Sequence, residues 1–109
     1  MTPQRGEIWW VSLDPTQGAE IRKTRPCLVL TTNTLNRLRQ TVVAVPLSTA
    51  ARAHLPITVS VTCQGQAAVA VIDQIRAVAT HRLQSKIETA SLTMVPAVLT
   101  ALVQILEMP

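Results

Sequence analysis

The residues best suited to chemistry on a phosphate group lie in the first half of the chain. Arg25 stands directly before Pro26 at the start of an apolar segment, so its backbone is stiff. Its guanidinium is permanently charged and matches two phosphate oxygens with a planar fork of N–H donors. Ser48 and Thr49 follow another apolar segment and offer hydroxyls that can bond a phosphate oxygen. Glu20, in the polar stretch before Arg25, could orient the guanidinium or accept a proton.

Positive charge is concentrated in the same region. The net charge is +4, and no acidic residue occurs between Ile21 and Ile72. The basic residues of this tract are Arg22, Lys23, Arg25, Arg37, Arg39 and Arg52. Brought together by the fold, they would form a face suited to a polyanion, whereas dispersed they would serve solubility. Composition leaves both interpretations open.

Composition also excludes several classes of protein. The chain has 109 residues, of which 48% are hydrophobic and 15% charged, which fits one folded domain over residues 1–109. Its longest apolar runs span six residues, too short for a membrane helix. The start of the sequence lacks an apolar stretch of signal-peptide type, so we expect a cytoplasmic protein without membrane association.

Metal and aromatic chemistry find little support in the sequence. Cys27 and Cys63 lie far apart in apolar segments, which favours two reduced core residues. The chain contains no Cys-x-x-Cys and no clustered carboxylates or histidines with ligand spacing, so we expect neither a metal nor another cofactor. Trp9 and Trp10 are the only aromatic residues, and neighbours on a strand point to opposite faces.

These residues must be positioned by a largely β fold. β-branched and apolar patterns predict strands over residues 7–13, 26–31, 41–47, 54–62, 67–78 and 86–90, with short helical turns near 33–39 and 80–83. Pro46 suggests a break or an edge, and Gln64-Gly65-Gln66 a turn. Asp73, Gln74 and Arg76 interrupt the longest apolar stretch, and the structural interpretation is an Asp73 carboxylate paired with Arg76 or with loop N–H groups.

One long helix is predicted at the end of the chain. Thr93 is its expected N-cap, which puts Pro96 in the first turn, where a missing N–H costs nothing. The predicted apolar face contains Val95, Val98, Leu99, Leu102 and Leu106. Further apolar residues on this helix have two interpretations: the helix contacts a second chain, or it packs against the sheet of its own chain. The expected fold is a small, mostly antiparallel β-barrel with a C-terminal helix.

Four segments in order resemble a known family. They are RGEIWWVSLDP, the pattern Gly18-x-Glu20-x-x-Lys23-x-Arg25-Pro26, VPLST and VIDQIRAV. Together they resemble the MazF/PemK family of toxins from type II toxin–antitoxin pairs. The resemblance implies an SH3-like barrel, a homodimer and inhibition by an acidic antitoxin. It also implies a metal-independent, sequence-selective endoribonuclease that cuts single-stranded RNA through attack by a 2′-hydroxyl.

The resemblance also implies roles for individual residues. Arg25 and Ser48 take the catalytic positions, and Glu20 matches a carboxylate near the scissile phosphate. The remaining expected RNA-binding residues are Arg22, Lys23, Thr49, Arg37, Arg39, Arg52, Asp73 and Gln74. Some members carry an arginine and a histidine where this chain has Val71 and Ala19, so an active site that uses those two groups is excluded.

Two other functions remain open at this point. A gyrase-poisoning toxin like CcdB shares the fold, but that group ends in tryptophan-glycine-isoleucine, unlike Ile105-Leu106-Glu107-Met108-Pro109. A non-catalytic nucleic-acid-binding barrel would account for the missing polar groups at Val71 and Ala19. The endoribonuclease is the leading hypothesis.

Overall fold

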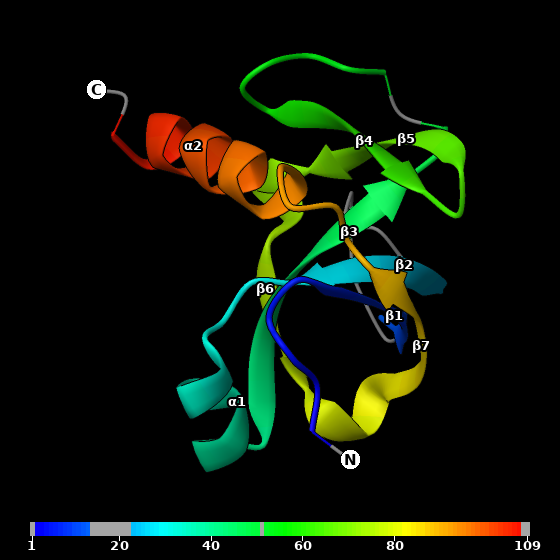
Figure 1. Ribbon diagram of the computed structural model, residues 1–109. Helices are drawn as coiled ribbons and strands as arrows, with labels where there is room; N and C mark the ends of the chain where they lie inside the picture. Colours follow the sequence, from blue (N-terminus) through cyan, green and yellow to red (C-terminus); the bar gives the residue numbers. More distant parts are fainter. Residues whose placement is uncertain (1, 14–22, 51, 108–109) are drawn as a thin grey trace.

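Seven strands and a C-terminal helix make up the fold (Figure 1). The computed structural model describes residues 2–13, 23–50 and 52–107. The strands are β1 (Glu7–Ser12), β2 (Thr24–Val29), β3 (Thr41–Ser48), β4 (Thr58–Cys63), β5 (Gln66–Val71), β6 (Arg76–Ala79) and β7 (Leu83–Thr89). The helices are α1 (Asn33–Leu38), α2 (Met94–Glu107) and the short 3₁₀ turns η1 (Ile72–Gln74) and η2 (Thr80–Arg82).

The strands form one antiparallel sheet in the order β4-β5-β3-β2-β1-β7, with β6 paired to β3. Within the described ranges no pairing joins β7 to β4 or β6, so the sheet curves like a barrel without closing. The predicted antiparallel β fold with a C-terminal helix is therefore confirmed, as an open barrel.

The partner strand of β3 changes near Pro46. β6 pairs with β3 as far as Ala44, and β5 pairs with it from Leu47 onward. Residues 71–75 of the β5–β6 connection thus face only residues 45–46 of β3. Proline suits this position because it lacks the N–H that a continuous ladder would use. The break or edge expected at Pro46 is not found in β3 itself, which continues through Pro46 as an interior strand; the change of partner lies beside it. The single strand expected over 67–78 is wrong, because η1 divides it into β5 and β6.

The other elements lie close to their expected positions. Thr32 caps α1, with its hydroxyl accepting a 3.4 Å hydrogen bond from Leu35 N–H. The strand expected from residue 54 begins only at Thr58, whose hydroxyl donates to the Arg52 carbonyl. The last strand begins at Leu83, earlier than expected. Local hydrogen bonds that the apolar pattern does not encode set these boundaries.

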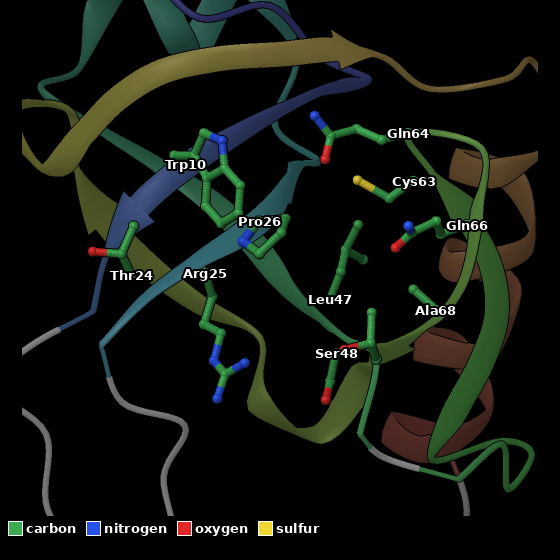
Figure 2. A pocket seen from close by; sticks show the side chains of 11 residues that line it. Trp10, Thr24, Arg25, Pro26, Leu47, Ser48, Cys63, Gln64, Gln66 and Ala68 are labelled. Atoms are coloured by element: carbon green, nitrogen blue, oxygen red, sulfur yellow. The ribbon is translucent and has the colours of Figure 1, made fainter.

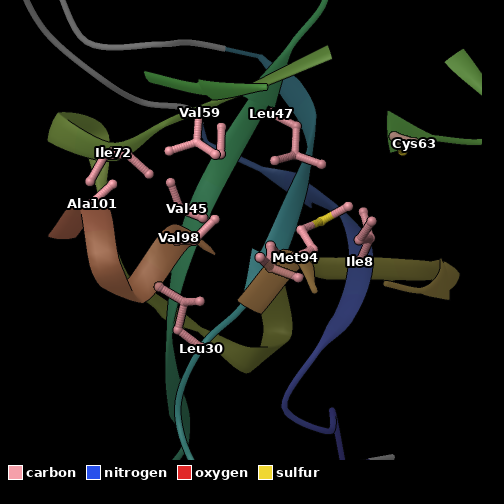
Figure 3. Packing of buried hydrophobic residues seen from close by; sticks show 12 residues of the cluster. Ile8, Leu30, Val45, Leu47, Val59, Cys63, Ile72, Met94, Val98 and Ala101 are labelled. Carbon is pink, nitrogen blue, oxygen red and sulfur yellow. The ribbon is translucent and has the colours of Figure 1, made fainter. Parts of the chain in front are cut away.

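Buried side chains form two clusters. The larger lies beneath α2 and includes Ile8, Val45, Ile72 and Val98 (Figure 3). The smaller contains Trp9, which is only 2% exposed, together with Val11, Val29 and Val42. Burying each such aliphatic side chain contributes about 1.5–3 kcal/mol, so the two clusters are the main stabilising feature of the fold.

The buried face of α2 differs from the predicted one. Met94, Val98 and Ala101 are its buried residues, whereas Leu106 is 74% exposed. The helix contacts η1 and β4, and Leu102 and Ile105 of its later turns are partly buried against the larger cluster, so Leu106 lies on the side that faces away from the core (Figure 1). A periodic apolar pattern cannot reveal where such a contact ends. None of the described helices is long and apolar enough to span a membrane.

Glu7 ties the start of the chain to β7. Its carboxylate accepts hydrogen bonds from the Gln4 backbone N–H at 2.7 Å and the Trp9 indole N–H at 3.0 Å. Lys86 Nζ lies 3.0 Å from its other oxygen. Burial alone raises the pKa of the Glu7 carboxyl, but these three donors outweigh burial and hold the pKa below the ordinary 4.5.

Candidate active site

A pocket of about 200 Å³ opens where β1, β2 and β3 meet the β4–β5 hairpin (Figure 2). Among the residues that line it are Arg25, Ser48 and Thr49. The structure therefore brings together the arginine and the two hydroxyls that the sequence selected from segments more than twenty residues apart.

Arg25 is held on β2 opposite Val11 of β1. Its side chain is half-buried, and its Nε is a buried donor without a hydrogen-bond partner among the described residues. A buried unpaired donor costs about 1–3 kcal/mol, a cost that an anionic oxygen in the pocket would remove. Arg25 is thus arranged to receive an anion.

Ser48 ends β3 on the same side of the pocket. Figure 2 shows its hydroxyl and the Arg25 guanidinium extending in the same direction from neighbouring strands. The Ser48 Oγ accepts a 3.1 Å hydrogen bond from the Ala50 N–H, which fixes the position of the oxygen. Thr49 is exposed at the rim. A phosphate held by Arg25 would therefore meet hydroxyl groups on its β3 side.

Asp73 and Gln74 lie in η1 and do not line the pocket. Arg76 donates to Gln74, from Nη2 to the side-chain oxygen at 3.1 Å and from Nε to the backbone carbonyl at 3.3 Å. The expected Asp73–Arg76 ion pair is wrong, because the tight turn brings the Gln74 oxygens to the guanidinium and leaves Asp73 exposed.

The described basic residues of the tract do not all lie near the pocket. Arg37 and Arg39 belong to α1 and its C-terminal end, at the start of β3, whereas Ser48 lies at the other end of that strand. Eight strand residues at about 3.3 Å each separate the two ends by roughly 23 Å. Lys23 and Arg52 are exposed close to β2 and to the end of β3. Glu20 and Arg22 lie outside the described residues.

Sequence reasoning did not assign a pocket role to Trp10, Cys63, Gln64 or Gln66. Strand alternation placed the two tryptophans on opposite faces without indicating which one was buried. The Gln64–Gly65 turn indicated a hairpin but not that the hairpin folds over β2. Burial, and then the nearby Glu88 carboxylate, raise the pKa of the Cys63 thiol, so Cys63 is a neutral wall residue rather than a nucleophile.

Two solved structures share this architecture over nearly the whole chain. MazF from Deinococcus radiodurans superimposes with a TM-score of 0.86 at 24% identity over 99% of both chains. A mycobacterial endoribonuclease in complex with its cognate antitoxin gives a TM-score of 0.80 at 24% identity, over 98% of this chain and 97% of that one. Both likenesses concern the fold.

The sequence places the chain within the same class. Residues 4–106 match the PemK-like, MazF-like toxin family of type II toxin–antitoxin systems, and the chain belongs to this family. Endoribonuclease PemK of Escherichia coli is 51% identical over 45 residues, covering 41% of this chain and 34% of that relative. Endoribonuclease toxin MazF of Escherichia coli K12 is 32% identical over 77 residues, covering 71% and 68% of the two chains.

Proposed function

We propose that this chain is a sequence-selective, metal-independent endoribonuclease that cleaves single-stranded RNA and thereby inhibits translation. The observation that carries the proposal is Arg25, which lines a pocket with Ser48 and Thr49 and whose Nε is buried with no hydrogen-bond partner among the described residues. A phosphodiester supplies the anionic oxygens that this donor lacks. The relatives named endoribonucleases support the same reaction.

The proposed chemistry uses the RNA as its own nucleophile. The 2′-oxygen before the cut bonds to phosphorus, the bond from phosphorus to the 5′-oxygen breaks, and a 2′,3′-cyclic phosphate and a 5′-hydroxyl result. The 2′-hydroxyl gives up a proton and the leaving 5′-oxygen takes one, so the reaction consumes no water in this step. Because nucleophile and phosphorus belong to one molecule, positioning supplies much of the acceleration.

Arg25 and Ser48 stabilise the transition state in this scheme. Negative charge grows on the non-bridging oxygens as the 2′-oxygen attacks, and donors fixed beforehand stabilise that charge most. Glu20 is proposed to orient Arg25 or to accept the 2′-proton. Four residues are proposed to hold the RNA near the site: Thr49, Arg22, Lys23 and Arg52. Four others lie outside the pocket and would contact only a part of the RNA farther from the cut: Arg37, Arg39, Asp73 and Gln74.

We further propose that the toxin is cytoplasmic, forms a homodimer and is inhibited by an acidic antitoxin. The net charge of +4 suits an acidic partner, and one solved relative is in complex with its cognate antitoxin. Exposed apolar side chains support a second copy. Val103 and Leu106 on α2 and Leu55 and Ile57 before β4 are exposed, and Leu55 also lines an open cavity of about 710 Å³ between α2 and β4.

The decisive experiment is cleavage of a long RNA in EDTA, with mapping of the new ends. We expect cutting to continue without divalent metal and to leave a 2′,3′-cyclic phosphate and a 5′-hydroxyl. A matched substrate with deoxyribose only before the cut should bind but remain intact, because it lacks the nucleophile. A 5′-phosphate product, a strict need for Mg²⁺ or cutting of the deoxy substrate would contradict the mechanism. Binding without any cleavage would instead indicate a non-catalytic barrel.

A further inference from the structure

The pocket has a second part that the proposed chemistry does not use. Beyond Arg25, its floor consists of Trp10, Pro26 and Leu47, which present an aromatic ring and two apolar side chains. Figure 2 shows Gln64 and Gln66 on the opposite wall, with the Gln64 amide directed toward Trp10. A flat apolar floor facing polar amides is chemistry suited to a planar, hydrogen-bonding ligand.

The wall is held in place by the β4–β5 hairpin. Cys63 pairs with Gln66, and the two residues between them form the turn, with φ of 54° at Gln64 and 75° at Gly65. Positive φ at both positions defines the tight turn whose twist suits a hairpin, but glutamine, unlike glycine, is strained there. The Gln64 backbone N–H donates to Glu88 Oε1 at 3.2 Å, which fastens the tip of the hairpin to β7.

Within the described part of the chain, the protein itself does not use the Gln64 or Gln66 side-chain amide. Among the described residues, neither amide makes a hydrogen bond, although both line the pocket. Each amide offers an N–H₂ donor beside a carbonyl acceptor, the pattern that pairs with the edge of a nucleobase. In single-stranded RNA the bases are unstacked, so one can lie on Trp10 while its edge faces the wall.

We infer that Gln64 and Gln66 read one base of the RNA beside the scissile phosphate, with Trp10 as the stacking surface. The inference rests on the proposed ribonuclease function, because Arg25 at the other end of the same pocket fixes the phosphate and hence the register of the strand. It explains why a strained glutamine stands where glycine would fit the turn better. Gln64 and Gln66 are specificity-determining residues in this scheme and take no part in bond cleavage.

The test is cleavage of an RNA pool with randomised positions around the cut, followed by sequencing of the products. Gln64→Ala and Gln66→Ala should each lower the preference for one base next to the cut by about tenfold, since a paired amide contributes discrimination of that order. Gln64→Glu should change the preferred base rather than only relax the preference, because it replaces the N–H₂ donor by an acceptor. Gln84→Ala, an exposed glutamine on β7 outside the pocket, should leave the cut sites unchanged.

Several outcomes would overturn the inference while the proposed function stands. Unchanged cut sites in all three pocket variants would do so, provided that their thermal unfolding shows them to be folded. So would a uniform loss of cleavage at every sequence, which would indicate a positioning or structural role.

If the wild-type chain does not cleave RNA at all, a binding experiment tests whether Gln64 and Gln66 select a base. Fully 2′-O-methylated oligonucleotides with the same randomised positions are selected on immobilised wild type and on the variants. Enrichment of one base that Gln64→Ala and Gln66→Ala abolish supports the inference even without catalysis. Equal enrichment in wild type and variants, or none, overturns it.

Discussion

Arg25 occupies an environment that favours a bound anion over the empty pocket. Its backbone is fixed between Val11 across the sheet and Pro26 along the chain, and its Nε is buried without a partner among the described residues. The protein alone bears the cost of that unmade hydrogen bond, and ligand binding removes it. Such local destabilisation at a binding site is common where function requires a group to be ready for its ligand.

Replacing Arg25 should therefore separate activity from stability. We expect Arg25→Ala to lower RNA cleavage by about 100-fold or more, while the midpoint of urea unfolding stays the same or rises. Arg25→Lys should restore little activity, because one ammonium cannot bond two phosphate oxygens in a plane. Single-turnover cleavage rates and unfolding curves measure both effects. Wild-type rates in the alanine variant would remove Arg25 from the site.

Residue roles could be predicted from the sequence only where type and spacing were sufficient. Arg25, Ser48 and Thr49 were selected because their chemistry suits a phosphate and because each ends or begins an apolar strand. Trp10 and Gln66 were not, since their role depends on a hairpin folding over β2 from a distant part of the chain. No local pattern encodes that contact.

At the scale of elements, β5, η1 and β6 show how a strand pattern can mislead. Residues 67–78 carry a strand-like sequence, and both halves do pair with β3. The 3₁₀ turn η1, opposite residues 45–46 of β3, divides them and places Ile72 beneath α2, where it is fully buried. Most of the strands and the long C-terminal helix were predictable from local patterns. The division was not, because it arises from pairing across the sheet.

The β4–β5 hairpin offers a prediction in which stability and specificity move in opposite directions. Gln64→Gly should raise the free energy of unfolding by up to about 1 kcal/mol, because glycine adopts a φ of 54° without strain. The same change should weaken base preference as Gln64→Ala does. Urea unfolding and pooled RNA cleavage on one protein preparation test both. A destabilised Gln64→Gly would show that the side chain supports the hairpin rather than reading RNA.

At the scale of the whole molecule, the basic residues are spread over distant positions, whereas the contacts of Glu7 join several elements at one place. Arg37 and Arg39 lie at the far end of β3 from Ser48, so the described basic residues are not all gathered around the pocket. Glu7, in contrast, concentrates three contacts at one buried point. Through Gln4, Trp9 and Lys86 it joins the start of the chain, the smaller core cluster and β7.

This arrangement predicts how the stability of the whole domain responds to acid. The pKa of Glu7 is lower in the folded protein than its ordinary 4.5, because the contacts with Gln4, Lys86 and Trp9 outweigh the effect of burial. The carboxylate therefore stabilises the fold fully above that ordinary value, and the contribution is lost as the pH falls through the folded pKa. Urea unfolding between about pH 7 and about pH 3 should show this loss.

Glu7→Gln should be about 1 kcal/mol less stable at neutral pH and should lose less stability on acidification. Lys86→Gln keeps the carboxylate but removes its cation, which brings the folded pKa of Glu7 closer to the ordinary value, so its acid-dependent loss should be smaller than in the wild type. Equal pH slopes in the wild type and Glu7→Gln would show that other carboxylates govern acid unfolding.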